Sequence, residues 1–115
     1  MSEPIYKILS AAQWEGAQRA GVFEGSELDL ADGYIHFSTG PQARETAAKH
    51  FAGQADLLLL TVDSQRCPPA ALRWEPSRGG ALFPHLYANL ELSSVVAVDE
   101  LPLDADGHRF PASFG

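Results

Sequence analysis

Hydrophobic and polar positions at the start of the chain predict a strand that leads directly into a helix. Ile5–Leu9 is apolar and partly β-branched, which is typical of a strand. Ser10 is followed by Gln13 at the spacing of a capping box, and Gly21 has the residue type that ends a helix. We therefore expect a first helix over about Ala11–Ala20.

The next part of the chain predicts a short strand and a second helix. Val22–Ala31 has the composition of a linking stretch, and Gly33 favours a turn before a short strand at Tyr34–Phe37. Pro41 suits the first turn of a helix, because its missing N–H needs no partner there. Apolar residues then recur on one helical face as far as Gly53.

Strand patterns dominate the second half. Leu57–Val62 is a continuous apolar run, as expected of a central strand buried on both faces. Leu72–Glu75 alternates and Val95–Val98 predicts a last strand, while Ser77–Gly80 is expected to be a loop from which Ala81–Tyr87 leads out.

Helices in the first half and strands in the second predict an α+β fold, a compact mixed or antiparallel sheet with two main helices packed on it. The 115 residues suit a single domain, 1–115. Its tail, about 104–115, contains Gly107 and Pro111 and is expected to be loosely held.

Charge limits the expected partners. The net charge is −7, with 15 acidic residues against 8 basic ones and no basic cluster. Counterion displacement from nucleic acid requires clustered Lys and Arg, and acidic proteins are repelled by anionic membranes. We expect no nucleic-acid partner and no membrane partner; the sequence names no protein partner.

The expected location is the cytoplasm. The N-terminus lacks the pattern of a secretory signal, and the longest apolar run, Leu57–Leu60, is too short to span a bilayer. Cys67 is the only cysteine, so that no internal disulfide forms. It also has no obvious activator, and we do not expect it to act as a nucleophile.

The first candidate site is the strand around His36. Alternation directs Tyr34, His36 and Ser38 to one face and Ile35 and Phe37 to the other. A core-like face backed by three hydrogen-bonding side chains is typical of a pocket floor. The alternative is a strand whose polar face simply meets solvent. The helix start at Thr39–Gln42 adds free backbone N–H groups, which form a weak anion site in any helix.

The second candidate site is the segment around His85. Tyr87 lies on the same side as His85 if the segment is extended, and Glu75 could act as a general base or orient a hydroxyl. The alternatives are a Pro-rich loop that closes onto the core and, for Glu75 with Arg78, an exposed ion pair.

The remaining histidines predict no metal site. The four histidines are scattered and none are at i, i+4 spacing. We expect His50 to be a core or boundary residue and His108 to be solvated. The P-loop, the dinucleotide-binding glycine motif and the nucleophile elbow are all missing.

Taken together, the motifs resemble a bacterial family, domain of unknown function 952. The resemblance covers nearly the whole chain and rests on six segments: Ile5–Leu9, Trp14–Ser26, Asp32–Thr39, Asp56–Asp63, Arg73–Glu75 and Phe83–Tyr87. It implies a fold similar to the ADP-ribosyltransferases, with the sheet split around a cleft. The strand at Tyr34–Ser38 also resembles the His-Val-His-Leu-Ser strand of RNA 2′-phosphotransferases, with His36 and Ser38 matching its second His and its Ser. The implied ligand is NAD or a related nucleotide.

One residue departs from the family pattern. Lys7 stands where many members have a first-strand His, and a lysine cation cannot accept a hydrogen bond. Lys7 would instead supply positive charge for an anionic group.

The leading hypothesis is an ADP-ribosyltransferase-like domain that binds a small nucleotide-like or phosphorylated ligand and acts as a transferase or hydrolase. His36, His85 and Glu75 are the catalytic candidates, and the ligand-binding candidates are Lys7, Tyr34, Ser38, Thr39, Arg78 and Tyr87. The alternatives are a non-catalytic metabolite-sensing or protein-binding module and a purely structural protein. They are distinguished by whether His36 and His85 line one open cleft or are buried in mutual contacts.

Overall fold

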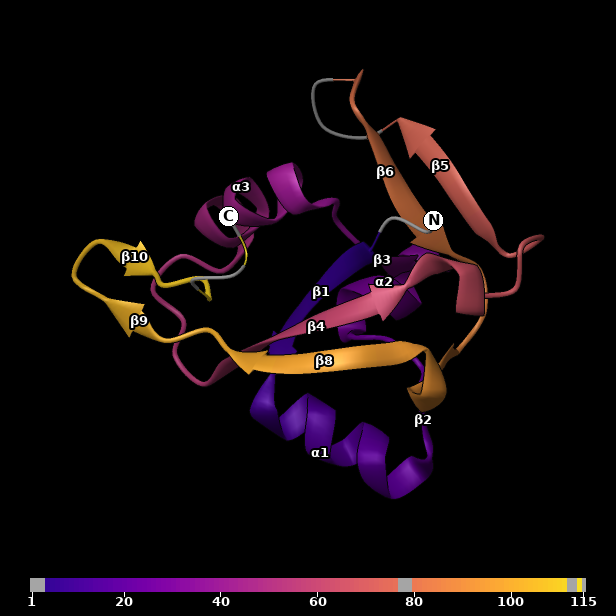
Figure 1. The fold of residues 1–115 in the computed structure, drawn as a ribbon, viewed down its shortest axis with the longest axis horizontal. Coiled ribbons are helices and arrows are strands. Elements are labelled where there is room, and N and C mark those ends of the chain that lie inside the picture. The colour runs from indigo at the N-terminus through magenta and orange to yellow at the C-terminus, as the bar shows by residue number, and fades with distance from the viewer. Residues whose placement is uncertain (1–3, 77–79, 112–113, 115) are drawn as a thin grey trace.

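Two three-stranded antiparallel sheets form the framework of the computed structural model, which describes residues 4–76, 80–111 and 114 (Figure 1). The first sheet has the order β1 (Pro4–Ser10), β4 (Leu57–Asp63) and β8 (Val95–Glu100). The second has the order β3 (Ile35–His36), β6 (Leu82–Leu86) and β5 (Leu72–Pro76). Tyr6 and Ser38 join the two sheets through an antiparallel bridge with two backbone hydrogen bonds of 2.7 and 2.9 Å.

The α-helices of the described residues all precede residue 51. They are α1 (Ala11–Ala20), α2 (Glu27–Asp32) and α3 (Gly40–His50). Short paired strands complete the fold: β2 (Val22–Phe23) with β7 (Leu90–Glu91), and β9 (Leu103–Asp104) with β10 (Gly107–His108); single 3-10 turns lie at Ser64–Arg66 and Leu92–Ser94. The expectation of an α+β fold is confirmed, with antiparallel sheets.

Local signals at the first helix are confirmed residue by residue. Ser10 accepts the backbone N–H of Gln13 at 3.0 Å, and the Gln13 side chain accepts the Ser10 N–H at 2.9 Å. Gly21 ends α1 with φ of 84°, a left-handed conformation that glycine adopts without strain.

Two expectations for secondary structure are wrong. Val22–Ala31 is not a linking stretch, because it contains β2 and most of α2, which begins with a second capping box between Ser26 and Asp29. Helix α3 ends at His50, before Gly53. The segment at Ala81–Tyr87 contains strand β6, which completes the second sheet. Most of the loop expected at Ser77–Gly80 lies outside the described residues.

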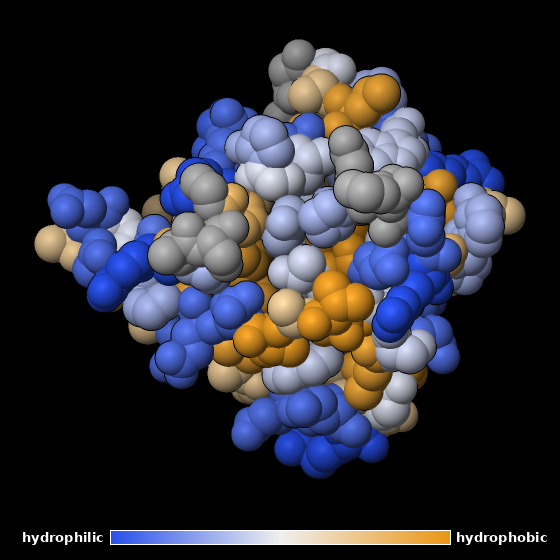
Figure 2. All heavy atoms as spheres, in the orientation of Figure 1, coloured by the Kyte–Doolittle hydropathy of each residue, from blue (hydrophilic) through white to orange (hydrophobic). Residues whose placement is uncertain are grey.

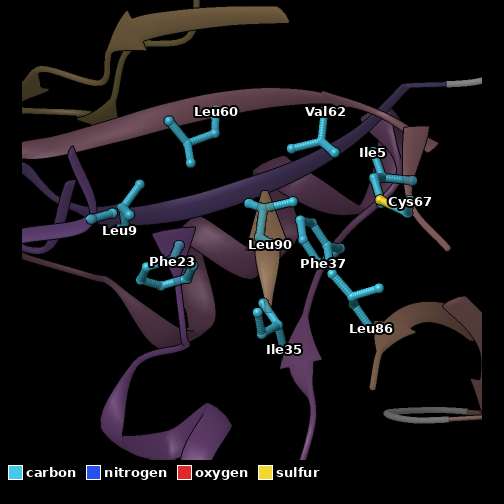
Figure 3. Packing of buried hydrophobic residues seen from close by; sticks show 11 residues of the cluster. Ile5, Leu9, Phe23, Ile35, Phe37, Leu60, Val62, Cys67, Leu86 and Leu90 are labelled. Atoms are coloured by element: carbon cyan, nitrogen blue, oxygen red, sulfur yellow. The ribbon is translucent and has the colours of Figure 1, made fainter. Parts of the chain in front are cut away.

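Strand β4 is the centre of the first sheet and is buried on both faces, as its sequence predicts. On one face, Leu60 and Val62 pack with residues of the second sheet and of β2 and β7; Figure 3 shows this cluster, in which Ile5, Leu9, Phe23, Ile35, Phe37, Cys67, Leu86 and Leu90 are also labelled. On the other face, Leu57 and Leu59 pack with Ile8, Ala47 and Leu101.

The described part of the tail is attached to the domain, in contrast to the loose segment that we expected. β9 and β10 form a hairpin, and Phe110 and Phe114 pack on the second hydrophobic cluster. The Arg44 guanidinium lies 4.8 Å from the centre of the Phe110 ring, and the rings of Tyr6 and Phe114 meet edge to face at 4.8 Å.

One face of the molecule carries exposed apolar residues. Figure 2 shows hydrophobic residues gathered across the middle of the face on which Figure 1 shows β8, with hydrophilic residues around them. Val96 and Val98 on β8 are both exposed.

Among the described residues, no helix is long and apolar enough to cross a membrane.

We expect Leu59→Ala to lower the free energy of unfolding by about 2–5 kcal/mol, because it removes buried apolar groups and leaves a cavity in the core beside the central strand. Leu59 is 1 % exposed. Urea denaturation measures the effect. Val96→Ala on exposed β8 is the control and should cost far less; equal losses for both variants would contradict the assignment of Leu59 to the core.

Candidate functional site

Strands β3 and β6 bring the two candidate histidines together. His36 and His85 are direct partners in the antiparallel register, and their ring centres lie 5.6 Å apart. Ile35 and Phe37 are buried on the opposite side of the strand, as the alternation predicts. The prediction that the two histidines lie on neighbouring segments is therefore confirmed.

Both histidines line the same cavity of about 770 Å³, which is bounded by residues of β1, α2, β3, α3 and β6. Of the predicted ligand-binding residues, Lys7 and Ser38 also line it. Tyr34 and Tyr87 line a separate, smaller hollow of about 230 Å³. Thr39 and Glu75 line neither space, and Arg78 lies outside the described residues.

The centre of the site is Asp29, which the sequence did not identify. Its carboxylate is 2 % exposed and lies 2.8 Å from the Lys7 ammonium group. Lys7 also donates to the backbone carbonyl of His36 at 3.0 Å. The Asp29 carboxylate further accepts the backbone N–H groups of Ser26, at 2.9 Å, and of His36, at 3.1 Å. One carboxylate therefore joins β1, β3 and the start of α2.

The local sequence around Asp29 explains its position. Ser26 and Asp29 form the capping box at the start of α2, which turns the Asp29 side chain back towards the helix start. Gly25 has φ of 120°, and a Cβ atom there would lie 2.9 Å from the Asp29 Cβ. Glycine is required at this position both for its backbone conformation and for the close approach.

The pair of Lys7 and Asp29 is an ion pair in a buried environment. Burial lowers the pKa of Lys7, and the neighbouring Asp29 charge opposes this change. Burial alone would raise the pKa of Asp29, but the hydrogen bond from His36 and the charge of Lys7 outweigh it and hold that pKa well below its usual range. Asp29 is therefore ionised at neutral pH.

His36 lies between two carboxylates of α2. Its Nδ1 is 2.6 Å from Asp29, and its Nε2 is 2.9 Å from Asp32, whose side chain is 42 % exposed. Carboxylates only accept hydrogen bonds, so the imidazolium form of His36 is the one that donates to both. The two carboxylates consequently hold the His36 ring in place, and both of its nitrogens are already engaged in hydrogen bonds within the protein.

His85 has a different environment. It is 3 % exposed, its Nδ1 is 2.8 Å from Glu75, and Tyr34 stacks on its ring with centres 4.1 Å apart. Tyr87 donates its hydroxyl to the same Glu75 oxygen at 2.7 Å. The hydrogen bonds from His85 and Tyr87 lower the pKa of Glu75, and the bond to Glu75 raises the pKa of Tyr87.

Two further predicted residues are used inside the fold. The Ser38 hydroxyl is 2.9 Å from the Thr46 hydroxyl, and the Thr39 backbone N–H donates to Gln42 at 3.0 Å. His50 is exposed at the cavity instead of packing in the core, and His108 bonds the Gln54 carbonyl at 2.7 Å through Nε2 instead of being only solvated.

The structure corrects two expectations about roles. Lys7 does not present an unpaired charge for an anionic ligand, because Asp29 neutralises it. His36 and His85 line an open cavity and are also held by internal hydrogen bonds, so that the two arrangements that we set against each other occur together.

The signal that could have revealed Asp29 was present in the sequence. Ser26 and Asp29 have the capping-box spacing, and a lysine inside an apolar strand requires a buried carboxylate. Among the described residues, no group of three or more His, Cys, Asp or Glu side chains is arranged to hold a metal ion.

Comparisons with known proteins identify close relatives. A model of the family described as "Protein of unknown function (DUF952)" matches residues 8–98. The crystal structure of protein CC0527 from Caulobacter crescentus is 54% identical, with a TM-score of 0.89 over 96% of this chain and 97% of that chain. The solution NMR structure of CC0527 is 57% identical, with a TM-score of 0.81 over 91% of this chain and 90% of that chain. The search of curated proteins found no match.

We expect Asp29→Asn to lower the free energy of unfolding by about 3–5 kcal/mol, because it leaves the buried Lys7 cation without a counter-charge. Chemical denaturation measures the loss, and Lys7→Met combined with Asp29→Asn should recover part of it. Glu45→Gln is the matched control, because Glu45 pairs with Lys49 at 3.6 Å on the exposed surface and such pairs contribute less than about 1 kcal/mol. An Asp29→Asn loss as small as that of Glu45→Gln would contradict the buried ion pair.

Acid should remove the contribution of Asp29 in a defined direction. Its pKa in the folded protein is depressed, so that the stabilisation is fully present above the unfolded value of about 3.9 and is lost as the pH falls towards the folded value. Unfolding free energies of the wild type and Asp29→Asn should therefore begin to converge as the pH falls below about 4. A difference that is constant from pH 7 to pH 2 would show that the Asp29 charge is not its source.

Proposed function

The chain belongs to the DUF952 family of proteins of unknown function, and we propose that it binds a nucleotide-like ligand in the cavity lined by His36 and His85. The observation that carries this proposal is the direct pairing of the two histidines across β3 and β6 at the wall of that cavity. The cavity volume of about 770 Å³ is within the range of small-molecule sites, roughly 300–1,000 Å³.

The charges around the cavity favour a sugar over a phosphate next to the histidines. Lys7 pairs with Asp29 and His36 pairs with Asp32, and the carboxylate of Glu27 adds a further negative charge at the α2 side of the cavity. Carboxylates accept hydrogen bonds from sugar hydroxyls and repel phosphate oxygens. We therefore assign the ribose of the ligand to the space beside Asp32 and the histidines, with any phosphate farther from α2.

The reaction class that suits this assignment is transfer or hydrolysis at the glycosidic bond of that ribose. The resemblance of the Tyr34–Ser38 strand to that of the RNA 2′-phosphotransferases, with the ADP-ribosyltransferase-like fold that the family implies, supports this class and supports NAD or a related nucleotide as the ligand. Glu75 would act through His85, because it contacts the His85 ring and does not itself line the cavity.

A non-catalytic binding module is the second candidate. It is favoured by Lys7 on the first strand, whose ammonium group is bonded to Asp29 and to the backbone carbonyl of His36. The ADP-ribosyltransferases that the motifs imply as a model carry a ligand-contacting His on their first strand. The two candidates differ in turnover. Release of nicotinamide from NAD would support the enzyme, whereas binding without any product would support the module.

We expect ADP-ribose and NAD to raise the melting temperature of the protein, because a ligand at a hundred times its Kd stabilises the fold by about 2.7 kcal/mol. Thermal shift followed by calorimetry measures the binding. Asp32→Ala, whose side chain is partly exposed, should weaken it at least tenfold with little loss of stability. Asp106→Ala in the β9–β10 turn is the matched control and should bind as the wild type does. Equal affinity of both variants, or no binding of either nucleotide at millimolar concentration, would overturn the proposal.

A further inference from the structure

We propose that Nε2 of His85 is the atom that accepts a proton from a hydroxyl of the ligand, with Glu75 and Tyr87 as its positioning residues. This inference rests on the proposed function, because it names what one wall of the same cavity does. It assigns different roles to the two histidines that the strand register brings together.

The Nδ1 nitrogen of His85 carries the proton of the neutral ring. Nδ1 of His85 lies 2.8 Å from a carboxylate oxygen of Glu75. A carboxylate with a lowered pKa is ionised and can only accept, so Nδ1 carries the proton of this bond. In the neutral ring Nε2 then holds a lone pair, and the second nitrogen is an acceptor.

The lone pair on Nε2 of His85 has no partner among the described residues. His85 is 3 % exposed, and no hydrogen bond or ion pair to its Nε2 exists within residues 4–76, 80–111 and 114. Buried polar side-chain atoms almost always have a hydrogen-bonding partner. His85 is among the residues that line the 770 Å³ cavity, and we infer that a donor in this cavity bonds Nε2. A hydroxyl group is a suitable donor.

Neighbouring side chains hold Glu75 and the His85 ring in place. Tyr87 donates to the same Glu75 oxygen at 2.7 Å, and the Arg73 guanidinium lies 5.0 Å from the centre of the Tyr87 ring. Tyr34 stacks on His85 and fixes its plane. Tyr87, which follows β6, therefore helps to hold Glu75 of β5 in place. Neither Glu75 nor Tyr87 lines the cavity, so Glu75 acts on a ligand only through His85.

His36 is excluded from the acceptor role by its own bonds. Both of its ring nitrogens face carboxylates, of Asp29 and Asp32, so that the form that satisfies both has no lone pair to offer. His36 contributes a ring that is held by α2 at the wall of the cavity, and His85 contributes the acceptor.

The proton step is balanced within these residues. The O–H bond of the ligand hydroxyl breaks, its electron pair stays on the oxygen, and the proton forms the Nε2–H bond of His85. The ring becomes an imidazolium whose charge is offset by the Glu75 carboxylate, and the ligand oxygen becomes a stronger nucleophile.

Imidazole nitrogen NMR of the free protein tests the tautomer. We expect His85 in the wild type to carry its proton on Nδ1 and none on Nε2 at neutral pH. Glu75→Gln should shift the proton to Nε2, because the glutamine amide can donate to Nδ1. Glu91→Gln, at the exposed position of β7, is the matched control and should leave the spectrum of His85 unchanged. An Nε2-protonated His85 in the wild type would overturn the inference.

Titration with ADP-ribose tests the contact. We expect the Nε2 resonance of His85 to move as the hydroxyl binds, and the Kd to weaken at least tenfold in Glu75→Gln but not in Glu91→Gln. Saturable binding without any change at Nε2 would overturn this inference and leave the proposed function standing. No binding of ADP-ribose at all would overturn both.

Discussion

A buried lysine on the first strand is the constraint on which the site depends. Lys7 lies between core residues Ile5 and Leu9, and an uncompensated cation there would cost several kcal/mol. Asp29 supplies the counter-charge from 22 residues away and thereby fixes α2 against β1. The same carboxylate holds the backbone and the ring of His36, so that compensation of a charge and positioning of a site residue are one arrangement.

The sequence predicted those elements whose signals are local. β1, α1 and β4 follow from an apolar run, a capping box and a terminal glycine, and each of these acts within a few residues. Helix α2 was not predicted, because its apolar residues are exposed and a charged residue is buried. Leu28 and Leu30 are 58% and 64% exposed while the charged Asp29 between them is buried, so that a periodicity of apolar residues cannot find it. Strand β6 was missed because Pro84 lies inside it.

The candidate site was predictable as a pair of histidines and not as a network. Strand alternation alone gives the face of His36, and the extended segment at His85 gives its neighbour. What the ring nitrogens bind depends on which segments meet in space: α2 for His36, and β5 for His85. Those contacts depend on the order of the strands in the sheet and on a salt bridge between distant residues. Neither produces a periodic pattern of residues that a single sequence would show.

The strand register then gives the two histidines different chemistry. His36 is the last residue of β3 and faces the acidic helix α2, where Asp29 and Asp32 occupy both of its nitrogens. His85 lies inside β6, next to β5, where, among the described residues, Glu75 is the hydrogen-bonding partner of its ring and bonds Nδ1. An edge strand and a central strand thus offer different neighbours to the same side chain. Because side chains of paired strands share a face, a one-residue slip of β3 would turn His36 into the core and remove it from the cavity. The bridge between Tyr6 and Ser38, two residues beyond His36, opposes such a slip by fixing the chain at the point where the two sheets meet.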